Sequence, residues 1–366
     1  MSDSGEKSYD VIIVGAGPAG LGAAIESGKA GARTLLLDEN QKPGGQLFKQ
    51  IHKFFGSKEH FAGMRGFLIG EKLLEEAVKH NVEFRLGARV WGLYPDGCVT
   101  ATDEENSLNF KGKKIILATG ASENALSFPG CTLPGVITAG AAQTFVNVQH
   151  VLPGKDFVVV GSGNVGLIVT YQLLQAGANV IKIIEAAPKI SGYGVHAAKI
   201  RRAGIQILTG HTIISASGRD QVERVIIAKV DENFNPIEGT QQTILCDTVA
   251  LAVGLSPRIE LAGAGGCEMT YSKTLGGVLP VHDDNMETSF EHILIAGDLS
   301  GIEEASTALD EGRLAGCRAA YRLGLMTLED YTSKKVMILN RLAELRCGPF
   351  GNKRMLAKEE IWKKAV

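Results

Sequence analysis

The sequence predicts an α/β protein in which two strand, glycine turn, helix, strand units occur, the second inserted into the first. Two observations predict this fold class. A glycine-rich fingerprint between apolar strands occurs near the N-terminus and again almost halfway along the chain. Motifs that complete the first unit lie on both sides of the second. A chain of 366 residues, 45% of them hydrophobic, is long enough for two domains.

The first unit is the segment DVIIVGAGPAGLGAAIESGKAGARTLLLDEN. Its apolar residues 11–14 predict a buried strand, and the glycines that follow have the spacing G-x-G-x-x-G. The first glycine permits a tight turn, the second lets the backbone approach a pyrophosphate, and the third lets helix and strand pack closely. The candidate binding residues of this loop are Gly15, Gly17, Pro18, Ala19 and Gly20.

An acidic residue follows the second strand of this unit. Residues 34–37 predict that strand, and Asp38 ends it. A carboxylate at this position accepts hydrogen bonds from the ribose hydroxyls of an adenosine. Asp38 fits this role, with Glu39 as the alternative.

The same pattern returns in FVVVGSGNVGLIVTYQLLQAGANVIKIIEAAP. Glu185 ends its second strand, and no arginine follows at once. A carboxylate there binds a free 2′-hydroxyl and repels a 2′-phosphate, so the site favours NAD, or another plain adenine nucleotide such as ATP or ADP, over NADP. The candidate residues of this loop are Gly161, Gly163, Asn164, Val165 and Gly166.

Three further motifs assign the first loop to FAD. They are PGGQLF, KKIILATGAS and TSFEHILIAGDLSG, and the last two are more than 170 residues apart. They complete one site only if the second nucleotide domain is inserted into the first. Their candidate residues are Gly45, Gln46, Ala118, Thr119, Gly120, Gly297 and Asp298. We expect two Rossmann-like domains: an FAD domain in two parts (1–121 and 246–327) and the inserted domain for NAD or another adenine nucleotide (122–245). A basic helical tail follows (328–366).

Composition excludes several functions. The net charge of −2 gives no electrostatic footprint for nucleic acid. The polar N-terminus and the lack of a long apolar run indicate a cytoplasmic protein with no membrane span. No cysteine pair has CxxC or metal-ligand spacing, so we expect reduced structural thiols and neither a metal site nor an internal iron-sulfur cluster. The six cysteines are Cys98, Cys131, Cys246, Cys267, Cys317 and Cys347.

On these motifs the chain resembles the two-dinucleotide-binding-domain flavoproteins, the group of thioredoxin reductase, over about residues 8–325. Within that group GGQLFKQIHKFFGSKEHFAGMRG, GVITAGAAQTFVN, VLPGKDFVVVGSGNVG and GDLSGIEEASTALDEGRLAG are similar to segments of FAD-binding alpha-type subunits of amine and amino-acid oxidoreductases. These include the alpha chains of sarcosine oxidase and of dye-linked proline or hydroxyproline dehydrogenase, the A-type chain of opine oxidase and the B-type chain of hydrogen cyanide synthase. The resemblance implies that the amine is oxidised at another flavin, on a beta-type subunit.

The chain departs from thioredoxin reductases at one position. Those enzymes carry CxxC where this sequence has Thr138, Ala139, Gly140 and Ala141. A segment without thiols cannot pass electrons as a dithiol. The resemblance therefore implies that electrons leave the flavin for another polypeptide, either a beta-type flavoprotein or a small iron-sulfur protein.

Residues 301–316 predict a helix just after Asp298, and the resemblance points its N-terminus at the flavin, where it would stabilise the anionic reduced ring. Glu303 and Glu304 are expected in its first turn as helix-end charges, and Thr307 is a candidate flavin contact. No catalytic residue can be assigned. A basic and aromatic loop suits either a wall that binds flavin or phosphate, or residues scattered over the surface of a long loop. It holds His52, Lys53, Phe54, Phe55, Lys58, His60 and Arg65.

The C-terminal segment 334–366 is strongly basic. It contains nine Lys or Arg and three Glu, which leaves a net charge of −8 on the rest of the chain. Apolar residues at helical spacing predict an amphipathic helix before the CGPFG turn. This tail either packs on its own domain or docks a partner subunit, with Phe350 and Trp362 as aromatic anchors.

The sequence thus predicts an FAD-containing electron-transfer subunit of a hetero-oligomeric dehydrogenase or oxidase of an amine, amino acid or imino acid. Two alternatives stay open. One is a stand-alone NADH-dependent reductase of a ferredoxin or small acceptor. The other is an assembly module whose second nucleotide is structural.

Overall fold

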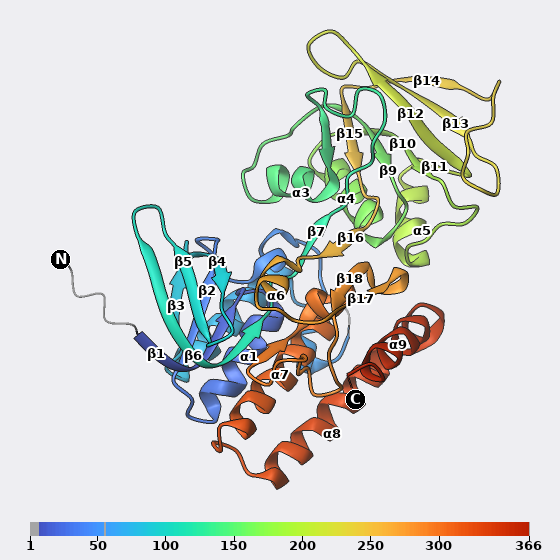
Figure 1. The fold of residues 1–366 in the computed structure, drawn as a ribbon. Helices are drawn as coiled ribbons and strands as arrows, with labels where there is room; N and C mark the ends of the chain where they lie inside the picture. Colours follow the sequence, from blue (N-terminus) through green and yellow to red (C-terminus); the bar gives the residue numbers. More distant parts are fainter. Residues whose placement is uncertain (1–6, 55, 366) are drawn as a thin grey trace. The chain divides into compact units, whose positions relative to one another are not determined.

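The protein folds into two compact units, described here from a computed structural model that covers residues 7–54 and 56–365. Unit 1 consists of Met1–Ser122 and Ser256–Val366, and unit 2 is the inserted segment Glu123–Leu255 (Figure 1). The expected insertion is therefore confirmed. Its expected end at residue 245 is wrong, because β15 (Thr248–Leu251) pairs with the sheet of unit 2. The C-terminal tail belongs to unit 1.

Unit 1 is built on a seven-stranded sheet in which one long strand carries two kinds of pairing. β6 pairs in parallel with β1 and β19 through its second half, and its first half pairs antiparallel with β5. The order is β3, β2, β1, β6, β5, β4. The strands are β1 (Lys7–Val14), β2 (Thr34–Asp38), β3 (Glu83–Leu86), β4 (Arg89–Leu93), β5 (Cys98–Thr102), β6 (Ser107–Leu117) and β19 (Ile293–Ile295).

Two helices of unit 1 pack unusually closely. α1 (Pro18–Lys29) and α7 (Ala305–Arg322) meet through glycines: a Cβ on Gly312 would lie 1.9 Å from the Ala19 carbonyl oxygen, and one on Gly316 would lie 2.4 Å from that of Ala23. Small residues are required here because backbone touches backbone. The remaining α-helices of the described unit are α2 (Gly66–Lys79), α6 (Glu260–Ala264), α8 (Leu328–Leu345) and α9 (Gly348–Trp362).

Short elements complete unit 1. The 3-10 turns are η1 (Gly45–Lys49), η2 (Lys58–His60), η3 (Lys273–Leu275) and η4 (Gly297–Ser300). β17 (Met269–Ser272) and β18 (Gly277–Pro280) form a hairpin, and β7 (Ala121–Glu123) pairs with β16 (Leu255–Pro257) where the chain passes between the units.

The basic tail forms two helices rather than one. α8 is the predicted amphipathic helix and buries Tyr331, Ile338 and Leu342. The sequence prediction missed α9, which begins directly after Cys347 with Pro349 in its first turn, where proline is well tolerated. Ala357 and Ile361 of α9 join a small core with Leu275 and Leu279.

Unit 2 has a five-stranded parallel sheet in the order β11, β10, β9, β15, β8, and a three-stranded antiparallel sheet. The parallel sheet contains β8 (Val136–Thr138), β9 (Asp156–Val160), β10 (Asn179–Glu185), β11 (Gln206–Thr209) and β15; its helices are α3 (Ala139–Asn147), α4 (Asn164–Gln175) and α5 (Gly194–Arg202). The antiparallel sheet contains β12 (His211–Ser217), β13 (Arg224–Lys229) and β14 (Gln242–Leu245). None of the helices in the described part of the chain is long and apolar enough to cross a membrane.

Candidate functional site: two glycine-rich loops

The first glycine-rich loop has the geometry that its spacing predicts. Gly15 follows β1 with φ +106°, and a Cβ there would lie 2.3 Å from the Ala118 carbonyl oxygen. A Cβ on Gly20 would lie 1.7 Å from the carbonyl oxygen of Gly15. Gly17 differs, since the nearest atom to a Cβ there is 4.0 Å away. The backbone of Gly17, next to Pro18 at the start of α1, therefore has the room that a pyrophosphate needs.

Asp38 and Glu39 have different partners. Asp38 is 8% exposed and accepts hydrogen bonds from the backbone N–H of Ala16 (2.5 Å) and of Asn40 (2.7 Å). Glu39 instead pairs with Arg258 at 3.0 Å, which together with Arg89 holds the pKa of its carboxyl below the usual range. Asp38, anchored on the loop itself, is the better candidate for a ribose contact.

The segment of Gly45 and Gln46 packs directly on this loop. The Gly44 N–H donates to the Ala16 carbonyl oxygen at 2.7 Å. A Cβ on Gly45 would approach the Gly17 Cα to 2.8 Å. Position 45 therefore has no room for a side chain against the glycine loop.

The segments around Ala118 and Gly297 reach the same loop through the sheet. The Ala118 N–H donates to the Val14 carbonyl oxygen at 2.8 Å, and the Ala296 N–H donates to that of Leu117 at 3.0 Å. A Cβ on Gly297 would lie 2.8 Å from the Ala19 Cβ. Parallel strands β1, β6 and β19 thus bring together residues that are almost 300 positions apart. Thr119 and Gly120 follow, and the Thr119 hydroxyl donates to the Arg258 carbonyl oxygen.

Asp298 lies deep in unit 1 and yet keeps part of its surface accessible. Burial, together with the neighbouring Glu311, raises the pKa of its carboxyl to about 6. The carboxylate accepts a long hydrogen bond of 3.4 Å from the Glu303 N–H. It has capacity left to accept a further hydrogen bond, as a ligand hydroxyl would provide.

The helix after Asp298 begins later than predicted. α7 starts at Ala305, and Glu304 is its N-cap, with a reciprocal capping box between Glu304 and Thr307. Glu303 and Glu304 therefore precede the first turn instead of occupying it. The Thr307 hydroxyl donates to the Glu304 carbonyl oxygen at 2.6 Å, so it serves the helix end itself.

A buried ion cluster behind this helix end was not predicted. Arg346 contacts Glu303 and Glu311 at 2.5 Å each, and Lys358 pairs with Glu311 and lies 2.8 Å from the Ser300 hydroxyl. Arg346 is 3% exposed and Lys358 is fully buried. Burial alone would raise the pKa of Glu311, but the two cations hold it below the usual range. Only the basic composition of the tail hinted at such a role.

The basic and aromatic loop is partly buried and partly exposed. His60 is buried, and its Nε2 lies 2.9 Å from Asp310 of α7, while His52 stacks on Phe54. Lys53, Lys58 and Arg65 are at the surface or half-buried. Phe55, like the side chain of Phe350 in the tail, lies outside the described residues.

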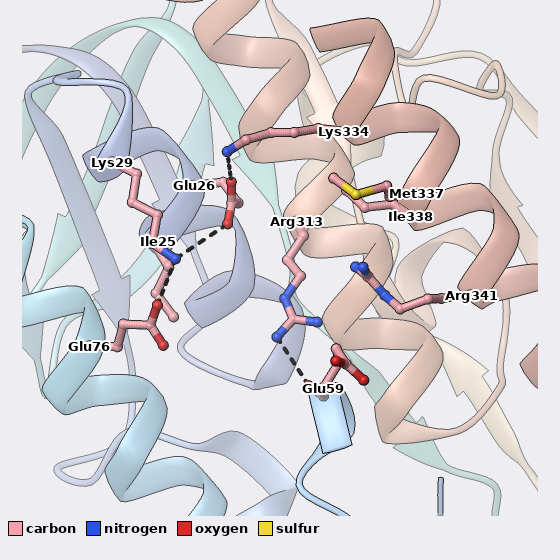
Figure 2. Close-up of a pocket in the computed structure, with 10 residues that line it drawn as sticks. All are labelled: Ile25, Glu26, Lys29, Glu59, Glu76, Arg313, Lys334, Met337, Ile338 and Arg341. Atoms are coloured by element: carbon pink, nitrogen blue, oxygen red, sulfur yellow. Dashed lines mark hydrogen bonds and ion pairs between the residues drawn. The ribbon is translucent and has the colours of Figure 1, made fainter. Parts of the chain in front are cut away.

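A pocket of about 220 Å³ lies between α1, α2, α7, α8 and η2. Figure 2 shows charged side chains of both signs around it: Lys334 reaches Glu26, and Lys29 reaches Glu76. Because these charged side chains pair with one another, we interpret the pocket as a structural contact region. The pair of Lys334 with Glu26 holds α8 against α1. Its lining residues are Ile25, Glu26, Lys29, Glu59, Glu76, Arg313, Lys334, Met337, Ile338 and Arg341.

The second loop, in unit 2, repeats the geometry of the first. Gly161 has φ +107°, and a Cβ on it would lie 2.2 Å from the Ala252 carbonyl oxygen. A Cβ on Gly166 would lie 2.3 Å from the Gly161 carbonyl oxygen, whereas at Gly163, the N-cap of α4, the nearest atom is 3.9 Å away. The Asn164 side chain accepts from the Tyr193 N–H at 2.8 Å, and Val165 is exposed.

Glu185 ends β10 as predicted and is bound to its loop. It accepts from the N–H and the hydroxyl of Ser162 (2.9 and 2.5 Å) and from the Ser191 hydroxyl (3.3 Å). The two serines were not singled out in the sequence. Ser162 lies within the glycine loop itself, between Gly161 and Gly163, and this position could have indicated it.

The position where thioredoxin reductases carry two cysteines is occupied by a carboxylate network. Thr138 ends β8 and donates to Glu123 at 2.5 Å, and the Gly140 N–H donates to the same carboxylate at 2.7 Å. The described residues contain no group of side chains suited to a metal ion, and no disulfide joins the six cysteines. Burial raises the pKa of the Cys246 and Cys317 thiols to about 12, which suits inert structural thiols.

Known proteins agree with this architecture. The family described as pyridine nucleotide-disulphide oxidoreductase matches residues 9–312. The chain belongs to this family. It is an FAD-dependent oxidoreductase, as the sequence motifs predicted.

Its relatives include named subunits of oxidases. The chain is 30% identical to the A-type chain of opine oxidase from Agrobacterium tumefaciens, over 92% of this chain and 70% of that protein. It is 28% identical to HcnB, a chain of hydrogen cyanide synthase from Pseudomonas protegens, over 92% and 76%. With the alpha chain of sarcosine oxidase from Corynebacterium it shares 26% identity over 86% of this chain, but spans only 33% of that longer protein.

Solved structures confirm the fold. Thioredoxin reductase of T. acidophilum matches with a TM-score of 0.71 at 21% identity, over 87% of this chain and 99% of the other. L-proline dehydrogenase of P. horikoshii matches with a TM-score of 0.73 at 22% identity, over 93% of this chain and 59% of the other. At these identities the likeness concerns the fold alone.

Proposed function

We propose that this chain is the FAD-binding electron-transfer subunit of a multi-subunit oxidoreductase that acts on an amine, amino acid or imino acid. The observation that carries the proposal is the carboxylate network of Glu123, Thr138 and Gly140. It stands where a dithiol would be needed for the chain to reduce a disulfide itself. Without a dithiol of its own, the chain would exchange flavin electrons with a group outside it, and we assign that group to a partner polypeptide.

The residues of unit 1 fit FAD. Gly17 leaves backbone room at the N-terminus of α1 for the pyrophosphate, and Asp38 is placed for the ribose. Asp298, deep but partly accessible, can accept a hydrogen bond from a ribityl hydroxyl. Bound FAD would supply the redox chemistry, and these residues supply position and field.

The residues of unit 2 fit NAD. Gly163 leaves room at the N-terminus of α4, and Glu185 presents a carboxylate at the ribose position. No arginine stands within the next fifteen positions to receive a 2′-phosphate. ATP or ADP would meet the same groups, so the redox role of this site needs its own test.

Membership in a larger complex is supported by the relatives. The matched chains of opine oxidase, hydrogen cyanide synthase and sarcosine oxidase are each named as subunits. The L-proline dehydrogenase match has the same fold and is named for an imino-acid substrate. The substrate class of the complex and its beta-type or iron-sulfur partners belong to the proposal.

Anaerobic mixing of the FAD-loaded chain with NADH tests the redox part. We expect rapid loss of the visible flavin absorbance, and no such loss in a Gly166→Ala variant that keeps its FAD. Wild-type chain that binds NADH without any loss of flavin absorbance would overturn this part and favour a structural nucleotide.

Affinity purification of the tagged chain from its native cells tests the part of the proposal that concerns the complex. A second flavoprotein in stoichiometric amount is the expected result. If the chain purifies alone and its reduced flavin is oxidised rapidly by an added ferredoxin or another small acceptor, it is a stand-alone reductase instead.

A further inference from the structure

The C-terminal helices place two cations, Arg346 and Lys358, in the interior of unit 1. The contacts of these two side chains extend to the turn that contains Asp298. Lys358 of α9 is fully buried, and Arg346 at the end of α8 is 3% exposed. Both reach Glu311 of α7. A buried lysine and arginine cost several kcal/mol each unless they are paired, so their burial depends on this carboxylate.

Glu311 connects these cations to the turn η4. Its Oε2 accepts from the Gly297 N–H at 3.1 Å and lies 2.8 Å from the Ser300 hydroxyl. Lys358 also contacts Ser300, at 2.8 Å. Both ends of the turn that carries Asp298 are thus held by one carboxylate, and that carboxylate is held by the tail.

The turn touches the first glycine loop. A Cβ on Gly297 would lie 2.8 Å from the Ala19 Cβ. A displacement of η4 would therefore move Asp298 relative to the loop at Gly15–Gly20. The turn and the loop are packed so closely here that position 297 has no room for a side chain.

Arg346 and Lys358 also compensate the negative charge around the turn η4. Three carboxylates, Asp298, Glu303 and Glu311, lie around the start of α7, and Arg346 and Lys358 face them. The ring of His282 is also buried here and is neutral, because burial and the cation Lys358 lower its pKa to about 4. Without Lys358, three negative groups would have Arg346 as their buried counter-charge among the described residues.

We propose that Arg346 and Lys358 are positioning residues of the flavin site: through Glu311 and Ser300 they fix the turn that holds Asp298, so the C-terminal helices are a working part of that site. This inference rests on the proposed binding of FAD by unit 1. It assigns the basic tail an internal role, whatever partner it also meets. Six of its nine cations pair with carboxylates of this chain, namely Lys334, Lys335, Arg341, Arg346, Arg354 and Lys358.

The test compares Lys358→Met with Lys334→Met in the full-length chain. Both remove a tail cation that pairs with a glutamate of unit 1, but Lys334 pairs with Glu26 on α1, away from η4. We expect Lys358→Met to weaken FAD binding about tenfold and to make the reduction potential of the bound flavin more negative, since Arg346 would then face the three carboxylates without the second buried cation. Lys334→Met should keep both values while losing some thermal stability.

A double variant separates charge from packing. In Glu311→Gln with Lys358→Met both partners are neutral, and glutamine can still accept from the Gly297 N–H. We expect FAD affinity to return towards the wild-type value. The inference is overturned if Lys358→Met and Lys334→Met have equal FAD affinity and equal flavin potential.

Ser300→Ala covers the case in which Lys358→Met does not fold. This variant keeps all charges and removes one hydroxyl between Lys358 and Glu311. Weaker FAD binding supports the inference, and unchanged FAD binding contradicts it. Wild-type chain that binds no FAD would instead refute the proposed function.

Discussion

The two glycine-rich loops share a backbone geometry but have different surroundings. In each, a Cβ on the third glycine would collide with the carbonyl oxygen of the first, at 1.7 Å for Gly20 and 2.3 Å for Gly166. In each, the acid at the end of the next strand accepts from a backbone N–H of the loop, Asp38 from Ala16 and Glu185 from Ser162. Both loops therefore have the same third-glycine contact and the same hydrogen bond from the loop to the acid at the strand end.

The surroundings differ in charge. Unit 1 buries Asp310 and Glu311 and pairs them with Arg341, Arg346 and Lys358. The described residues of unit 2 contain a single ion pair, which joins the exposed side chains of Arg219 and Asp220. Unit 1 therefore buries ionised side chains as ion pairs, whereas carboxylates of unit 2 such as Glu123 and Glu185 accept hydrogen bonds from hydroxyl and backbone N–H groups.

The largest expected effect comes from adding a side chain at the third glycine of one loop at a time. Gly20→Ala should abolish FAD binding and destabilise unit 1 by about 3 kcal/mol or more, because the new Cβ meets backbone that cannot move aside. Gly166→Ala should abolish NADH binding and leave FAD in place. Flavin content after gel filtration and NADH titration measure the two results; loss of FAD in both variants would contradict independent sites.

The second effect tests the dependence of unit 1 on charge. Asp310→Asn should cost about 3 kcal/mol at neutral pH, since it leaves His60, Arg313 and Arg341 without their carboxylate. Although burial alone would raise the pKa of Asp310, these partners hold it far below the usual range. Its contribution is therefore present above about pH 4 and lost as the pH falls further.

Chemical denaturation across pH measures this loss. The difference between wild type and Asp310→Asn should shrink in acid. Asp220→Asn in unit 2 is the matched control and should change nothing. An equal loss at every pH would mean that Asp310 acts through packing alone.

The third effect concerns His282, whose Nε2 is buried without a hydrogen-bond partner among the described residues. Its pKa is lowered to about 4, so the unfolded chain takes up a proton near pH 6.5 that the folded chain refuses. Stability from this group is therefore complete above pH 6.5 and falls as the pH drops towards 4. His282→Leu should flatten the fall of the melting temperature over that range.

Titration of Asp298 changes stability with pH in the opposite direction to His282 over the same pH range. Its raised pKa of about 6 means that its contribution is complete below about pH 4 and is lost as the pH rises through 6. Asp298→Asn should therefore steepen the acid-side fall that His282→Leu flattens. If neither substitution changes the slope, the two groups do not titrate as their burial requires.

The smallest effect is expected at the ribose acid of unit 2. Glu185→Gln should weaken NADH binding about fivefold, because one charge-assisted hydrogen bond becomes neutral. It should also narrow the preference for NADH over NADPH. Glu238→Gln, at an exposed site of the same unit, should alter neither. Equal binding of NADH and NADPH by wild type would contradict the assignment.

Local patterns were predictable from the sequence where neighbouring residues determine them. Both glycine loops and the acids Asp38 and Glu185 follow from spacing within about 35 residues, and the insertion follows from FAD motifs that lie on both sides of the second loop. The end of unit 2 was misplaced because the apolar segment TVALAV suits a strand of either unit. Only the pairing of β15 with β9 decides between them.

Long-range pairing explains what the sequence did not show. Arg346 and Lys358 are separated from Glu311 by 35 and 47 positions, and nothing in a basic helical segment marks which cations are buried. Glu303 and Glu304 looked like first-turn residues because acidic residues favour either side of a helix start. The capping box with Thr307 fixes the start at Ala305.

The central claim of the proposal is that the flavin of unit 1 exchanges electrons with a nucleotide bound by unit 2 and that no dithiol of this chain takes part. Anaerobic titration of the FAD-loaded chain with NADH tests it most directly. We expect the flavin absorbance to disappear after one equivalent of NADH per FAD, with no second phase. Consumption of a further equivalent with the appearance of new reactive thiols would contradict the claim.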